Sequence, residues 1–141
     1  MMEVMGVAEA VLYVDDLPEA TAFYREVLGL PLTLSFEDAS FLQTGEHSTL
    51  ILFDRQQLKI RVSQIPGHGA EGAGHVALAI PHEEMAAWRG RLEDHGVEIE
   101  HEQDWPQGTH SLYFRDPAGN SVELIDGRHY PRVWARIGEG R

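Results

Sequence analysis

The chain has 141 residues, of which 43% are hydrophobic and 24% are charged, and its formal net charge is −12. This balance is typical of a folded globular protein and excludes a disordered chain. A strongly negative chain without a basic cluster in its body is a poor match for a phosphate backbone, so we expect no nucleic-acid partner.

Cysteine is absent, which excludes disulfides, thiolate metal sites and a cysteine nucleophile, and fits a cytoplasmic location. The apolar runs are short, so we expect neither a transmembrane helix nor a membrane partner. Residues 1–5 lack the basic and apolar regions of a signal peptide. The eight histidines are the unusual feature of the composition, because histidine ligates metals and moves protons near neutral pH.

A first module with the element order β-α-β-β-β is predicted over about residues 7–54. Its helix should begin after the N-cap Asp16, with Pro18 in the first turn, and end at Gly29. Segments rich in β-branched and aromatic residues, separated by turn residues, predict its strands at 9–14, 32–36, 40–43 and 49–53.

The connection 55–74 ends in a glycine-rich run from Pro66 to Gly74, which predicts a linker or a mobile flap. His68 lies in this run. As part of a lid over a site it would bind substrate. Alternatively, it is a loop histidine in solvent.

A second module is predicted over about residues 75–126. The helix-ending glycines Gly29 and Gly96 are 67 residues apart, and the opening strands are 66 residues apart. This near-constant offset indicates two copies of one unit of about 60 residues. The predicted elements of the second copy are a strand at 75–80, a helix at 83–95, and strands at 97–100, 110–114 and 121–125.

Alternation within the strands predicts which side chains share a face. The opening strands of the two modules and the last strand each place one group that could ligate a metal on the face away from the helix. These groups are Glu9, His75 and Glu123, and Glu9 and His75 stand at matching positions of the two copies.

Four segments also resemble the vicinal oxygen chelate superfamily, which includes glyoxalase I, extradiol dioxygenases, fosfomycin-modifying enzymes and bleomycin resistance proteins. The resemblance extends over about residues 7–126, and its most specific part is the closing hairpin Ser-Leu-Tyr-Phe-Arg-Asp-Pro-Ala-Gly-Asn-Ser-Val-Glu-Leu. The matching segments are 11–17, 23–30, 74–78 and 111–124.

The resemblance implies an α+β fold in which two βαβββ modules form an open, cup-like mixed β-sheet with the helices outside. We therefore expect one glyoxalase-like domain over residues 1–141, with a C-terminal tail at 127–141. Open cups of this kind expose sheet edges, and closure by a two-fold partner predicts a homodimer.

The resemblance further implies a divalent metal ion held by Glu9, His75 and Glu123. The first ligand is usually histidine in this superfamily, and here it is a carboxylate. Two carboxylates and one imidazole neutralise a divalent ion, and the set leaves manganese, iron, nickel, zinc and magnesium open. A further carboxylate of glyoxalase I corresponds to Ile51, which disfavours that activity. Taken singly, Glu9 could be a solvated residue at a strand end, and the three together an empty polar pocket.

Further residues are candidates for substrate binding or catalysis. By resemblance to fosfomycin-modifying enzymes, Ser111 and Tyr113 contact substrate, and Tyr113 is a catalytic candidate; alternatively, Tyr113 is an aromatic at the rim. His110 is a candidate general base at a strand end of opposite parity, or a surface histidine. The favoured function is a metal-dependent lyase, isomerase or dioxygenase acting on a small oxygen-chelating substrate. The alternative is a metal-free protein that sequesters a ligand, similar to the bleomycin resistance proteins.

Overall fold

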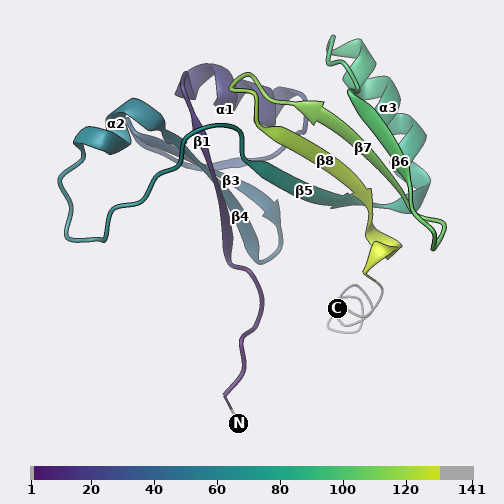
Figure 1. Cartoon of the computed structure of the whole chain (residues 1–141), viewed down its shortest axis with the longest axis horizontal. Helices are drawn as coiled ribbons and strands as arrows, with labels where there is room; N and C mark the ends of the chain where they lie inside the picture. The colour runs from purple at the N-terminus through teal and green to yellow at the C-terminus, as the bar shows by residue number, and fades with distance from the viewer. Residues whose placement is uncertain (1, 131–141) are drawn as a thin grey trace. The chain divides into compact units, whose positions relative to one another are not determined.

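The computed structural model describes residues 2–130, which fold as two units of the same α+β plan (Figure 1). Among the described residues, unit 1 comprises 2–74 together with the turn Asp116–Asn120, and unit 2 comprises His75–Arg115 with 121–130. Most of the predicted C-terminal tail, residues 131–141, lies outside the described residues.

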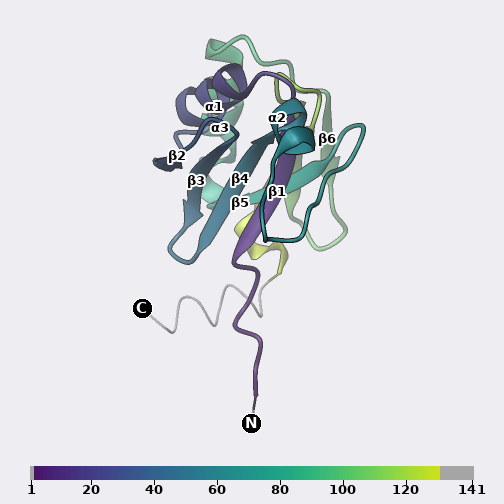
Figure 2. The same cartoon turned by 90° about the vertical axis from the view of Figure 1, so that its left-hand side faces the viewer.

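Unit 1 contains a four-stranded mixed sheet with the strand order β1-β4-β3-β2, which Figure 2 shows from one side. β1 and β4 are parallel, and the other two pairs are antiparallel. The elements are β1 (Glu9–Val14), α1 (Leu17–Glu26), β2 (Leu32–Ser35), β3 (Ala39–Gly45), β4 (Ser48–Asp54) and α2 (Arg55–Ile60).

Helix α1 begins as the sequence predicts but ends at Glu26, with Val27 as its C-cap, ahead of the predicted end at Gly29. The Asp16 side chain accepts a hydrogen bond of 3.0 Å from the backbone N–H of Glu19. Gly29 has a φ of 69°, a left-handed conformation that favours glycine after a helix. The helix packs against β3 and β4, and the core between them includes the fully buried Tyr24, Leu50 and Leu52. Burial of one such leucine contributes about 2 kcal/mol.

Unit 2 repeats the plan, with the strand order β5-β8-β7-β6 and a parallel β5–β8 pair. Its elements are β5 (His75–Ile80), the 3₁₀ turn η1 (His82–Glu84), α3 (Met85–Asp94), β6 (His101–Asp104), β7 (His110–Arg115), β8 (Ser121–Asp126) and the 3₁₀ turn η2 (Gly127–His129). The predicted α+β fold of two βαβββ modules with open sheets is therefore confirmed.

Two elements differ from prediction. The strand expected at 97–100 lies at His101–Asp104, a segment without apolar residues. Its position is set by its partner strand, because His101 pairs with Tyr113 and the other β6 residues pair in order along β7. The connection also begins with helix α2, because the Asp54 carboxylate caps the N–H groups of Gln56 and Gln57. No helix among residues 2–130 is long and apolar enough to cross a membrane.

Candidate metal and substrate site

Four predicted site residues lie on one face of the unit 2 sheet. Glu123 pairs with both Tyr113 and Ala77, which is two residues after His75. Ser111 is two residues before Tyr113, so alternation places it on the same face. The opposite face holds the buried side chains of Leu112, Phe114, Val122 and Leu124. The predicted partition of these strands into a core face and a site face is thus observed.

Glu123 is a buried carboxylate held by a short chain of hydrogen bonds. Its side chain is only 8% exposed. The Ser111 hydroxyl donates to Oε2 of Glu123 at 2.6 Å, and the Trp105 indole N–H donates to the Ser111 oxygen at 3.0 Å. One carboxylate oxygen is therefore fixed, while the other, Oε1, lies 3.2 Å from Nε2 of His75. The sequence analysis did not identify this series of hydrogen bonds, although Trp105 and Ser111 lie only six residues apart.

The environment of His75 determines which of its nitrogens can bind a cation. Nδ1 lies 3.1 Å from the carbonyl oxygen of Ser121. A carbonyl only accepts, so Nδ1 holds the hydrogen of that bond. Nε2 then either holds a second hydrogen and donates to Glu123, or directs a lone pair toward the Glu123 oxygen. A cation between the two atoms satisfies the second arrangement, since a ligating histidine commonly donates its other N–H to a carbonyl.

The separation of these two donors fits a shared ion. Two ligand atoms about 2.1 Å from one ion and at right angles to each other are about 3.0 Å apart. Nε2 of His75 and Oε1 of Glu123 are 3.2 Å apart, and the His75 side chain is 49% exposed. Among residues 2–130, no group of three or more histidine, aspartate or glutamate side chains is gathered as a complete metal centre. Two of the three predicted metal ligands, His75 and Glu123, therefore lie together in unit 2.

Tyr113 stands beside this pair. Its ring is nearly parallel to that of His75, with 6.3 Å between the ring centroids and 19° between the planes. Burial, and then the negative charge of Glu123, raise the pKa of the Tyr113 phenol. A phenol with a raised pKa remains protonated near neutral pH, so it can donate a hydrogen bond to a ligand on this face.

Glu9 belongs to unit 1, where it is the exposed first residue of β1. It pairs with Thr49, as His75 pairs with Ser121 in unit 2. Each of these strands lies at the edge of its sheet and runs parallel to the last strand of its unit. Glu9 and His75 therefore stand at equivalent positions of the repeated plan.

His110 lies on the α3 side of the unit 2 sheet, on the face opposite to Glu123. Its Nε2 is 2.7 Å from Glu102 and its Nδ1 is 2.7 Å from Asp104, while Arg89 of α3 also donates to Glu102. Burial alone lowers the pKa of His110, but the hydrogen bonds to the two carboxylates raise it by more. Both ring nitrogens thus bond to carboxylates. To act in the pocket, His110 would need the end of β7 to twist until its ring reached the Glu123 face, and its ring lies on the other face.

His68 lies on the face of the unit 1 sheet away from α1. Its Nδ1 is 2.7 Å from the Tyr13 hydroxyl, and its ring meets that of Phe53 edge-on with 4.9 Å between centroids. This face is apolar: Ala39, Ile51 and Phe53 are buried in it, and Val11, Tyr13, Phe41 and Leu58 pack against them. His68 therefore contacts this face through Tyr13 and Phe53, while the residue itself stays exposed to solvent.

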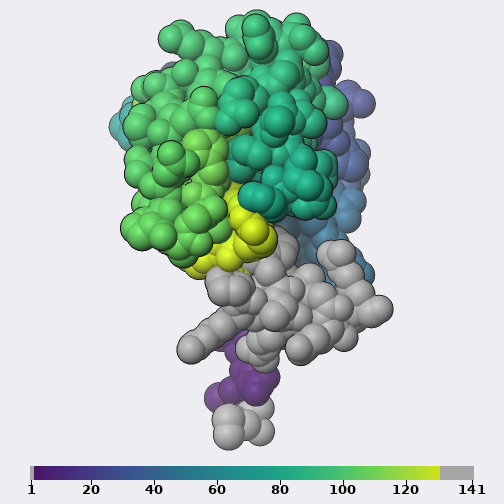
Figure 3. Space-filling model, turned by 90° about the vertical axis from the view of Figure 1, so that its right-hand side faces the viewer, coloured from purple at the N-terminus to yellow at the C-terminus, as the bar shows by residue number. Residues whose placement is uncertain are grey.

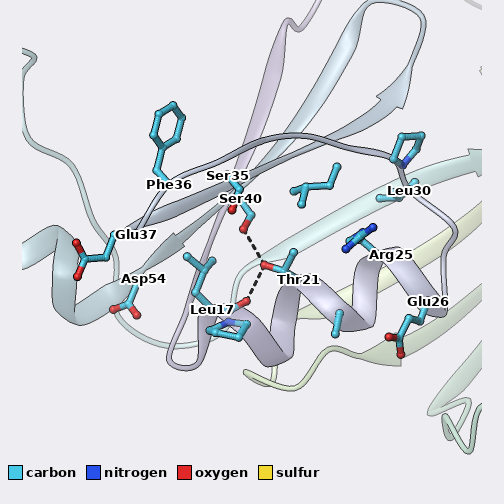
Figure 4. Close-up of a pocket in the computed structure, with 14 residues that line it drawn as sticks. Leu17, Thr21, Arg25, Glu26, Leu30, Ser35, Phe36, Glu37, Ser40 and Asp54 are labelled. Atoms are coloured by element: carbon cyan, nitrogen blue, oxygen red, sulfur yellow. Dashed lines mark hydrogen bonds between the residues drawn. The ribbon is translucent and has the colours of Figure 1, made fainter.

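Two cavities lie apart from the predicted site residues. One of about 700 Å³ lies beside α1 in unit 1, where Thr21 and Ser40 share a 2.8 Å hydrogen bond (Figure 4). The other, of about 470 Å³, lies in unit 2 between residues 79–83 and Gly127–Arg128. Figure 3 shows these two segments, teal and yellow, side by side. No predicted catalytic, substrate or metal residue lines either cavity.

Comparison with known proteins identifies a matching family and several similar proteins. A family model described as the glyoxalase/bleomycin resistance protein/dioxygenase superfamily matches residues 6–124. The chain is 24% identical over 132 residues to metallothiol transferase FosB of Bacillus licheniformis, covering 93% of this chain and 81% of that protein. It is 30% identical over 138 residues to catechol-2,3-dioxygenase of Bacillus subtilis, covering 93% of this chain but only 44% of that protein.

Among solved structures, the chain is similar to a crystal structure of lactoylglutathione lyase from Agrobacterium tumefaciens. The identity is 38%, the TM-score is 0.85, and the match covers 92% of this chain and 98% of that one. A crystal structure of the fosfomycin resistance protein FosX from Listeria monocytogenes is similar in fold, with a TM-score of 0.68 and 24% identity, and the match covers 92% of this chain and 99% of that one.

Proposed function

Because the chain belongs to the glyoxalase/bleomycin resistance protein/dioxygenase superfamily, we propose that it is a divalent-metal-dependent enzyme acting on a small substrate that chelates through two neighbouring oxygens. The observation that supports this proposal is the His75–Glu123 pair, 3.2 Å apart, with the remaining polar atoms of both side chains already bonded within unit 2. Several relatives are enzymes by name, among them a metallothiol transferase, a dioxygenase and a lyase.

The ion would be held by His75, Glu123 and Glu9, which are two carboxylates and one imidazole. A divalent ion there supplies Lewis-acid stabilisation of negative charge on a substrate oxygen, which lyase, isomerase and dioxygenase reactions all use. The donor set admits manganese, iron, nickel, zinc and magnesium. The Ser121 carbonyl sets the ring orientation of His75, and the Ser111 hydroxyl orients Glu123.

Tyr113 is the proposed catalytic residue of this face. As a neutral phenol beside His75 it would donate a hydrogen bond, or a proton, to a substrate oxygen. Ser111 is fully buried, with its hydroxyl shared between Glu123 and Trp105, so we assign it to holding Glu123 rather than to direct substrate contact. His68 would contact the substrate from unit 1. We assign His110 no catalytic role, because its nitrogens face Glu102 and Asp104 on the α3 side.

We further propose that the activity is not that of glyoxalase I. Ile51 pairs with Val11 in unit 1 as Glu123 pairs with Ala77 in unit 2, so an apolar side chain occupies the position equivalent to Glu123. Ile51 is 3% exposed and cannot donate to a metal. The similar structure from Agrobacterium tumefaciens is named lactoylglutathione lyase, which is the activity of glyoxalase I, so this activity is the one to assay. Full lactoylglutathione lyase activity of this chain would contradict the proposal.

Elemental analysis of protein purified without added metal tests the proposal. The wild type should retain one divalent ion per chain. Glu9→Gln removes a charge but keeps an oxygen donor, so it should bind metal more weakly, whereas His75→Ala removes a donor and should lose metal more completely. His101→Ala is the matched control, because this histidine contacts the same Tyr113 ring but is not hydrogen-bonded to Glu123.

Each outcome separates the alternatives. If Glu9→Gln leaves the metal content unchanged while His75→Ala lowers it, Glu9 is a solvated strand-end residue. If no variant changes the metal content because the wild type binds none, the protein is a metal-free binding protein and the enzyme proposal fails.

We also propose that the protein forms a homodimer. The edge strands β1 and β5 each pair on one side only within their sheets. Light scattering at micromolar concentration should therefore give about twice the chain mass of 15.8 kDa. A stable monomer would contradict the dimer without affecting the metal proposal.

A further inference from the structure

The segment 61–74, which connects the two units along the chain, contains no buried residue. Every one of its side chains is exposed, and it contains no helix or strand. Burial of apolar surface therefore cannot hold this segment in place. Its position must depend on polar contacts. Two long ion pairs, Arg61–Asp38 and Lys59–Glu71, join solvent-accessible side chains and contribute little. Three hydrogen bonds reach the segment from α2, from β1 and from the turn at 116–120.

Arg55 makes the most extensive of these contacts. Its side chain, the first of α2, is only 11% exposed. Nη1 donates to the carbonyl of Ala70, Nη2 donates to the carbonyl of Tyr13 at 3.1 Å, and Nε donates to Asp15 at 3.1 Å. All three guanidinium nitrogens are thus engaged, and they join the end of β1 to the connecting segment two residues after His68.

The other two bonds lie on either side of Ala70. The N–H of Gly74 donates to Oδ1 of Asn120 at 2.7 Å, and Nδ2 of Asn120 donates to the same Tyr13 carbonyl at 3.1 Å. On the other side, Nδ1 of His68 lies 2.7 Å from the Tyr13 hydroxyl. The backbone and the side chain of Tyr13 therefore both face the segment, and the Arg55 bond to Ala70 lies closer to His68 along the chain than the bond at Gly74.

We infer that Arg55 is a positioning residue that holds the His68 imidazole against the Tyr13 hydroxyl at the edge of the apolar face of unit 1. This inference rests on the proposed function, in which His68 contacts the substrate. The pair lies beside the apolar face of unit 1, next to a cavity of about 270 Å³. Tyr13, Leu58 and His68 line this cavity together with the charged residues Arg55, Lys59 and Glu71. Such a surface fits a substrate with an apolar or aromatic body and one polar atom bonded by the pair.

Charge supports a substrate without an anionic group at this place. Each guanidinium nitrogen of Arg55 donates one hydrogen bond to a protein acceptor, and Lys59 is paired with Glu71 at 3.5 Å. Among the described residues that line the cavity, no other lysine or arginine is present. Both cationic groups therefore already have partners within unit 1, which favours a neutral substrate atom here over phosphate or carboxylate.

The experiment follows the His68 ring itself. Long-range ¹H–¹⁵N spectra of the imidazoles, with His68 assigned through His68→Gln, report whether Nδ1 is hydrogen-bonded. The wild type should show one hydrogen-bonded tautomer. Arg55→Lys and Arg55→Ala should both move the His68 signals toward those of an exposed histidine, as should Tyr13→Phe. Two Arg55 variants are used because Arg55→Ala alone could unfold α2, which circular dichroism would reveal.

Cleavage by a glutamate-specific protease at Glu71 gives a second measurement. Loss of the Arg55 bonds should speed cleavage at this site by about tenfold, since local opening becomes easier. Tyr13→Phe should leave the cleavage rate near that of the wild type, because the Arg55 bonds remain. Arg61→Ala is the matched control: Arg61 lies in the same segment but pairs with Asp38 at 3.5 Å, and neither measurement should change.

The inference is overturned if the His68 signals and the cleavage rate are unchanged in both Arg55 variants, or if Arg61→Ala has the same effects. Metal content distinguishes this from failure of the proposed function. A wild type that binds no metal but responds to Arg55 substitution would contradict the enzyme proposal alone. A wild type that binds metal but shows no His68 response would contradict the positioning role alone.

Discussion

The hydroxyl of Ser111 donates a 2.6 Å hydrogen bond to Oε2 of Glu123, and both side chains are buried on the site face of unit 2. The bond orients the carboxylate so that its other oxygen faces His75. Partners that orient a metal ligand typically affect metal affinity by about 10- to 100-fold.

Ser111→Ala should therefore weaken binding of Zn²⁺ by about tenfold or more while the protein remains folded. Competition with a chelating dye measures the affinity. Thr109→Val is the control, because it removes a buried hydroxyl that bonds to His129 instead of Glu123. Equal zinc affinity in Ser111→Ala and the wild type would show that the Ser111 bond does not support the metal site.

Tyr24→Phe should destabilise unit 1 without changing metal content. The Tyr24 hydroxyl is buried and donates to Asp116 at 2.8 Å. Burial, and then the Asp116 carboxylate, raise the pKa of Tyr24 far above its ordinary value, so the phenol stays a neutral donor. Urea denaturation should show a loss of about 1.5–3 kcal/mol, the range for a hydrogen bond to a charged group. Tyr130→Phe, at a 60% exposed position, should lose much less; equal losses would refute the role of Asp116.

Acid should destabilise the protein partly through Asp126. Hydrogen bonds from the Arg128 side chain hold the pKa of this buried carboxyl well below its ordinary 3.8, although burial acts in the opposite direction. A lowered folded-state pKa means that the stabilisation is present above the unfolded value and is lost as pH falls through the folded one. Asp126→Asn should be less stable at pH 7 and lose less stability in acid. Asp94→Asn, at an exposed site, should keep the wild-type acid profile.

His110 should give the opposite dependence. Burial lowers the pKa of His110, but the hydrogen bonds that His110 donates to Glu102 and Asp104 outweigh it and raise the pKa above its ordinary 6.5. Its contribution to stability is therefore full below that value and is lost as pH rises through the folded-state pKa. In urea melts, His110→Gln should lose stability at acidic pH and converge with the wild type at alkaline pH. His47→Gln, whose side chain is 89% exposed, should follow the wild type throughout; a constant difference for His110→Gln would exclude the ionic role.

The sequence by itself determined the repeated module plan. Alternation in the strands placed Glu123 and Tyr113 on one face, because successive side chains of a strand point to opposite sides whatever lies around it. The Asp16 cap and the left-handed turn at Gly29 were equally local, since each depends on the backbone within a few residues. The equivalence of Glu9 and His75 followed from the constant offset between the two copies.

Only the tertiary structure decided features that depend on residues distant in sequence. Strand β6 lies at His101–Asp104 because its backbone pairs with β7, and no apolar pattern in the segment signals this. The Arg55 guanidinium bonds to Ala70, 15 positions away, and to Asp15, 40 positions away. Local propensity contains no information on such distant acceptors. Pairing partners and buried hydrogen bonds are properties of the folded chain, because a polar group that loses water must find whichever partner the fold brings near.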